Sequence, residues 1–166
     1  MAWYSDLAFA AGDIPTAATL NKIPSNFGTL APAGDPSVAI AYSSTWAAAG
    51  TAVDLGNGTV TAWYGRVGGL VWVSIKVTAG SSTTFGTGML SVTLPVLPKV
   101  DGTLFHGWIN DSGTGYQLLG RSASTTVNLY HAESATDGLV NQTTGTAPVA
   151  LGSGDTIEVN GTYWAY

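Results

Sequence analysis

Residues 59–80 read Thr-Val-Thr-Ala-Trp-Tyr-Gly-Arg-Val-Gly-Gly-Leu-Val-Trp-Val-Ser-Ile-Lys-Val-Thr-Ala-Gly. Two runs rich in β-branched and aromatic residues flank a short link at 66–69, a pattern typical of an antiparallel hairpin. Side chains alternate between the two faces of a strand. One face of the second run is purely β-branched, and we expect it to line a core: Val71, Val73, Ile75 and Val77. The other face is mixed, and we expect it to meet water or a neighbouring subunit: Leu70, Trp72, Ser74 and Lys76.

The rest of the chain from residue 37 onward follows the same pattern of short strands and turns. Gly-rich and Asp-rich segments such as Asn57-Gly58 and Asp137-Gly138 separate the runs. Eight or nine short strands in one domain favour an all-β, antiparallel β-sandwich, and we expect a jelly roll. The expected strands are 38–42, 45–48, 59–64, 70–78, 89–94, 104–109, 116–119, 125–131 and 156–163.

The composition indicates a protein that assembles with other copies of itself or with other proteins. Only 9% of the 166 residues are charged, against about 25% in ordinary soluble domains. A surface so poor in charge is unusual for a free monomer, so we expect much of it to be covered by other copies or other proteins. The net charge is −5 and the five basic residues are scattered. Binding to nucleic acid or to an anionic membrane is therefore not expected.

The chain contains no cysteine, which excludes disulfides, thiolate metal sites and cysteine nucleophiles. Its first residues lack the basic start and apolar core of a signal peptide. We therefore expect a protein that is made in a cytoplasm and stays there until it assembles.

The first 36 residues differ from the rest and form an expected N-terminal arm, followed by a β-domain at 37–166. The arm is mostly irregular, with one short helix expected near 16–22, where Thr16 is a suitable N-cap and Pro24 favours a stop. A helix this short is unstable alone in water, so the arm must lie against something. Residues 28–36 read as a linker.

Two stretches resemble tail proteins of phages that infect actinobacteria. The first, Phe9-Ala-Ala-Gly-Asp-Ile-Pro-Thr-Ala-Ala-Thr-Leu-Asn21, is similar to a short motif at the start of tail-fibre and minor tail proteins. The second is similar to a β-domain at the C-terminal end of such proteins. It consists of Gly56-Asn-Gly-Thr59, Tyr64-Gly-Arg-Val-Gly68, Val71, Val73, Thr83-Thr-Phe-Gly86 and Leu94-Pro95.

This resemblance implies a virion protein, usually a homotrimer, whose arm attaches to the particle and whose β-sandwich projects outward. The residues it implies for virion attachment are Phe9, Asp13, Leu20 and Asn21. No long shaft separates the arm from the β-domain, so the expected object is a short tail spike. A capsid decoration protein is the alternative. A carbohydrate-binding module or wall-degrading domain is a weaker one.

No catalytic or metal-binding constellation is specified by the sequence. A metal site could be assembled from His106, Asp111, His131 and Glu133, but nothing in their spacing requires one. A Gly-x-Ser-x-Gly nucleophile motif is absent, and most acidic residues lie in expected turns, where Asp is favoured for backbone hydrogen bonding. We expect no enzymatic activity and no cofactor.

The many Trp and Tyr residues are expected to serve mainly in core and inter-subunit packing. A subset on an exposed rim could stack on sugar rings of a host cell-wall glycan. Trp108 and Tyr116 flank the polar segment 110–115. Together with Asn110 and Asp111 they are the predicted glycan or partner contacts.

Overall fold

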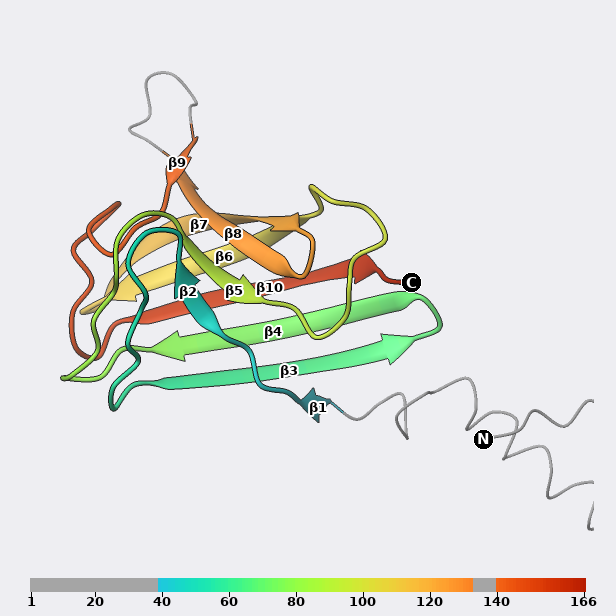
Figure 1. Ribbon diagram of the computed structural model, residues 1–166, viewed down its shortest axis with the longest axis horizontal. Helices are drawn as coiled ribbons and strands as arrows, with labels where there is room; N and C mark the ends of the chain where they lie inside the picture. The colour runs from blue at the N-terminus through green and yellow to red at the C-terminus, as the bar shows by residue number, and fades with distance from the viewer. Residues whose placement is uncertain (1–38, 133–139) are drawn as a thin grey trace, which may run out of the picture.

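The computed structural model describes residues 39–132 and 140–166, and every element in these ranges is a β-strand (Figure 1). The all-β, antiparallel prediction is thus confirmed. The arm with its expected helix, the linker and Glu133 lie outside the described residues. The strands are β1 (Ile40–Ala41), β2 (Trp46–Ala48), β3 (Thr59–Val67), β4 (Leu70–Thr78), β5 (Leu90–Thr93), β6 (Leu104–Asp111), β7 (Thr114–Ala123), β8 (Thr126–Ala132), β9 (Val140–Gln142) and β10 (Thr156–Trp164).

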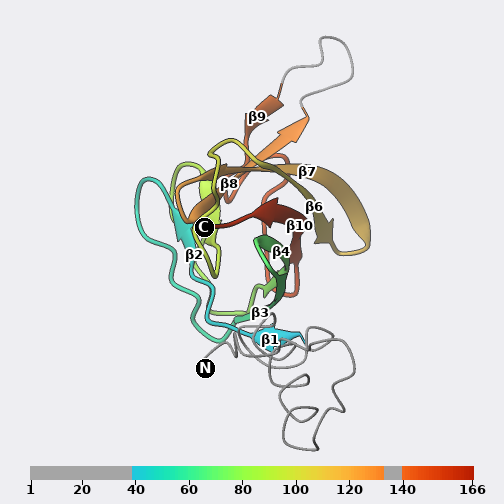
Figure 2. The ribbon, with the colours of Figure 1, turned by 90° about the vertical axis from the view of Figure 1, so that its right-hand side faces the viewer.

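The strands form one continuous antiparallel sheet in the order β1-β3-β4-β10-β6-β7-β8-β5-β2, with β9 paired to β8. The jelly roll of two packed sheets is not confirmed, because β10 pairs with β4 on one side and β6 on the other and so joins the two halves. Figure 2 shows how the sheet curls, so that its halves face each other across the core. The result is a half-barrel.

A four-residue link brings the two edges of the sheet together. β1 and β2 lie at opposite edges, yet only residues 42–45 separate them. The Tyr42 amide donates to the Ala62 carbonyl at 3.0 Å, on the β3 side. On the β5 side, the Tyr42 hydroxyl and the Ser44 hydroxyl both donate to the Thr93 carbonyl, at 3.1 and 2.8 Å. Side-chain and backbone hydrogen bonds of residues 42–45 therefore hold the β3 and β5 sides of the curled sheet together, and we call this contact the seam.

The core fills the inside of the curl. The four predicted core residues of β4 are all buried, with at most 2% of each exposed. Ile157 and Val159 of β10 pair with Val77 and Ile75, which places them on the same inner face. Phe105 of β6 is fully buried, and its ring lies 5.8 Å from that of Tyr163.

The β3–β4 hairpin has a shorter turn than expected. β3 continues to Val67, which pairs with Leu70, so the turn consists of Gly68 and Gly69 alone. Gly68 has φ of +58°, a left-handed conformation that glycine adopts without steric cost. Every strand expected from 37 onward is present, and β9 was not expected.

Candidate functional site

The outer face of β3, β4, β10 and β6 exposes tryptophan rings. Exposure is 42% for Trp63, 48% for Trp108 and 64% for Trp164. Large exposed aromatic groups in contiguous patches mark interaction surfaces. Apart from these rings, the face is made mainly of Thr, Ser and Asn side chains, together with one exposed ion pair at 2.9 Å between Lys76 and Glu158.

Glycines allow the outer tryptophans to lie against the sheet. A Cβ added to Gly65 would overlap three ring atoms of Trp72, and a Cβ added to Gly115 would overlap the ring of Trp108. A Cβ at Gly69 would stand 3.0 Å from a ring carbon of Trp164. Each indole therefore covers bare backbone on one side.

The structure separates the residues predicted to contact a glycan. Trp108 and Asn110 point outward from β6, whereas Tyr116 of β7 lies on the inner face and packs against the core. The segment between them is not a loop. Ser112 and Gly113 form a two-residue turn with φ of +49° and +93°, and the Asn110 side chain accepts a hydrogen bond from the Gly113 amide at 3.0 Å. Trp108 and Tyr116 thus cannot form one stacking platform, because they occupy opposite faces of the sheet.

The residues considered for a metal site are also divided. His106 is exposed on the outer face, and His131 is buried on the inner face, 3.3 Å from the Thr143 hydroxyl. Within residues 39–132 and 140–166, no group of three or more His, Cys, Asp or Glu side chains could hold a metal ion. The same ranges contain no helix of the length and hydropathy that a membrane span requires.

Most acidic side chains of the described ranges are engaged in local structure. Asp54, Asp101 and Asp155 each accept a backbone amide hydrogen bond, from Gly56 at 3.0 Å, Ser124 at 2.7 Å and Gly152 at 2.6 Å. Glu158 pairs with Lys76. The turn-forming role expected for the aspartates accounts for these contacts.

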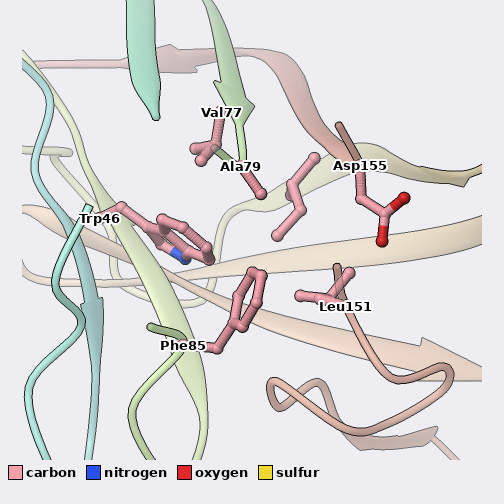
Figure 3. Close-up of a pocket in the computed structure, with 7 residues that line it drawn as sticks. Trp46, Val77, Ala79, Phe85, Leu151 and Asp155 are labelled. Atoms are coloured by element: carbon pink, nitrogen blue, oxygen red, sulfur yellow. The ribbon is translucent and has the colours of Figure 1, made fainter. Parts of the chain in front are cut away.

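One end of the half-barrel holds a small apolar pocket beneath Trp46 (Figure 3). It has no room for a water molecule. The Trp46 ring meets the Phe85 ring at 5.6 Å with 70° between the planes, and its buried Nε1 has no hydrogen-bond partner in the described part of the chain. This pocket belongs to the core. Its lining is Trp46, Val77, Ala79, Phe85, Leu151, Asp155 and Ile157.

A larger groove of about 160 Å³ lies on the outer face, where β6, β7 and β8 meet β9. Sequence reasoning did not find it, because its lining comes from four strands whose register the sequence does not reveal. It is lined by Leu104, Leu119, Gly120, Arg121, Tyr130 and Val140.

No protein-family model matches this chain, and neither does any curated protein or solved structure. The resemblance to phage tail proteins therefore stays a prediction. What the chain does has to be inferred from its own residues and their geometry.

Proposed function

We propose that this chain is a non-enzymatic structural protein of a phage particle, a short tail spike or minor tail protein. In this proposal the arm at 1–36 attaches to other virion proteins, and the β-domain at 37–166 faces the host surface. The observation that carries it is the outer face of the half-barrel, which exposes Trp63 and Trp164 on a surface with few charges.

Two further features support a binding role over a catalytic one. The acidic residues that accept turn hydrogen bonds or pair with lysine are already engaged, whereas general acid–base chemistry needs groups positioned toward a substrate. The exposed aromatic rings lie on regular strands, and sites built on strands hold their geometry better than sites on loops.

The assembly we propose is a homotrimer that is made in the host cytoplasm and carried in the virion. Its partners are other copies of itself, virion proteins that hold the arm, and a glycan of the host cell wall. The low charge of the chain is equally suited to a capsid decoration protein, which would cover capsomer junctions.

An experiment on purified particles tests the proposal. Particles from a lysate are banded on a density gradient and probed with an antibody raised against residues 39–166. We expect the protein to co-migrate with intact particles, and a chain lacking residues 1–36 to fold but fail to incorporate. A full-length chain found only in the soluble fraction would contradict the proposal.

A further inference from the structure

Three tryptophans on adjacent strands form a straight diagonal across the outer face. Gly65, two residues after Trp63 on β3, pairs with Trp72 on β4. Trp72 pairs with Thr162 on β10, and Trp164 lies two residues further in the same direction. Each step therefore moves one strand across and two residues along, a spacing of about 7–8 Å between neighbours.

The rings along this diagonal are held as a platform. Trp72 covers Gly65 and Trp164 packs against Gly69, so the backbone supports one side of these two rings. Trp164 remains 64% exposed and Trp63 42% exposed. The electron-rich faces of aromatic rings attract groups with a partial positive charge, and the C–H faces of a pyranose ring are such groups.

Polar groups beside the diagonal suit the hydroxyls of a sugar. Ser74 pairs with Trp63 and with Asn160, and Thr162 pairs with Trp72, so all three stand on the same outer face. None of these three side chains makes a hydrogen bond within the described residues. Lys76 and Glu158 on this face form an ion pair at 2.9 Å, so this pair adds no net charge beside the diagonal.

The curvature of the sheet favours a linear ligand over a second copy of the chain. The core lies inside the curl, so the outer face is convex (Figure 2). Two convex faces touch over a small area, whereas a stable protein pair buries about 800 Å² on each partner. An extended polysaccharide can lie along a convex diagonal and contact each ring in turn.

We propose that the diagonal of Trp63, Trp72 and Trp164 binds a neutral, extended polysaccharide strand. This inference deepens the proposed function, and rests on it only in placing that polysaccharide on a host surface. It moves the glycan site away from Trp108, Asn110, Asp111 and Tyr116, where the sequence had suggested it.

Binding to defined polysaccharides tests the inference. The full chain is mixed with insoluble chitin, insoluble cellulose or soluble polygalacturonate, and with soluble chito-oligosaccharides while tryptophan fluorescence is followed. We expect binding to at least one neutral polymer and weaker binding to the acidic one, because the chain carries a net charge of −5. W63A and W164A should each weaken binding about tenfold, the loss of one aromatic contact, and W164F should restore most of it.

W108A is the matched control, because Trp108 also covers a glycine and is similarly exposed but lies off the diagonal. It should bind as the wild type does, and circular dichroism melts should show that all variants fold. The inference is overturned if the wild type binds no neutral polymer, if W63A and W164A bind normally, or if W108A alone loses binding. None of these results bears on whether the protein sits in the virion, which the gradient experiment decides independently.

Discussion

The indole ring of Trp72 lies directly over Gly65, its register partner on the neighbouring strand. Neither residue is explained without the other. Glycine weakens a strand interior by about 0.5–1 kcal/mol relative to alanine. Here the apolar contact of the Trp72 ring with the backbone of Gly65 offsets that loss, and any side chain at position 65 would overlap the ring. The pair also positions the central ring of the proposed glycan platform.

Gly65→Ala should destabilise the domain only while the Trp72 ring is present. In the wild-type background we expect a loss of about 1–3 kcal/mol, because the new methyl group forces the ring away from the sheet. In a Trp72→Ala background the same change should be neutral or stabilising by up to about 1 kcal/mol. Urea unfolding of the four proteins completes a double-mutant cycle. Equal effects in both backgrounds would show that the ring does not rest on this glycine.

Thr93→Val should loosen the seam where the sheet closes. The Thr93 hydroxyl accepts a hydrogen bond from the Thr45 amide at 2.8 Å, and valine cannot replace it. We expect a loss of about 0.5–1.5 kcal/mol, with faster hydrogen exchange at the Thr45 amide. Thr61→Val, on the exposed face of β3, is the control and should leave that exchange unchanged. Unaltered exchange in Thr93→Val would mean that the seam does not depend on this contact.

Trp46→Phe should cost much less than Trp46→Ala. The indole N–H has no hydrogen-bond partner in the described structure, so phenylalanine loses volume but no hydrogen bond. We expect about 1–2 kcal/mol for phenylalanine and about 3–5 kcal/mol for alanine. Thermal or urea unfolding measures both. Similar losses in the two variants would indicate that the N–H does have a partner.

Stability should fall as the pH rises above about 10. Burial raises the pKa of Tyr163 from 10.0 to about 12. Burial also raises the pKa of Tyr42. Between about pH 10 and about pH 12 these tyrosines are deprotonated in the unfolded chain but stay protonated in the folded chain. Unfolding therefore releases protons, and the free energy of unfolding falls as the pH rises through this range.

Tyr163→Phe isolates this effect. The variant is expected to start less stable, because it lacks the hydrogen bond from the Tyr163 hydroxyl to the Val96 carbonyl, but to decline less steeply with pH. The difference in slope should reach at most about 1.4 kcal/mol per pH unit, measured by urea unfolding between about pH 10 and about pH 12. Parallel slopes for variant and wild type would show that Tyr163 ionises equally in both states.

Strand positions and the core face could be predicted, because both follow from local pattern. Alternation in residues 70–77 assigned each side chain of β4 to the correct face. Gly-rich and Asp-rich segments separated the strands. β9, three residues with no buried side chain, has no alternation to reveal it.

Long-range pairing could not be predicted, and it decides the site. Nothing in the local pattern indicates that β10 inserts between β4 and β6, so one curled sheet was not distinguished from two packed sheets. The same gap affects the predicted glycan contacts. Trp108 and Tyr116 are close in sequence, but Trp108 pairs with Gln117, which leaves Tyr116 on the opposite face. The diagonal of tryptophans spans about 100 residues of sequence and depends on two registers.

The most direct test of the central claim is a cryo-electron microscopy reconstruction of the intact phage particle. We predict density for the half-barrel at the tail tip, in few copies, with the arm inserted among other tail proteins and the tryptophan face outward. Density at capsomer junctions in many copies would instead make the chain a decoration protein. Its absence from the particle would contradict the proposed function altogether.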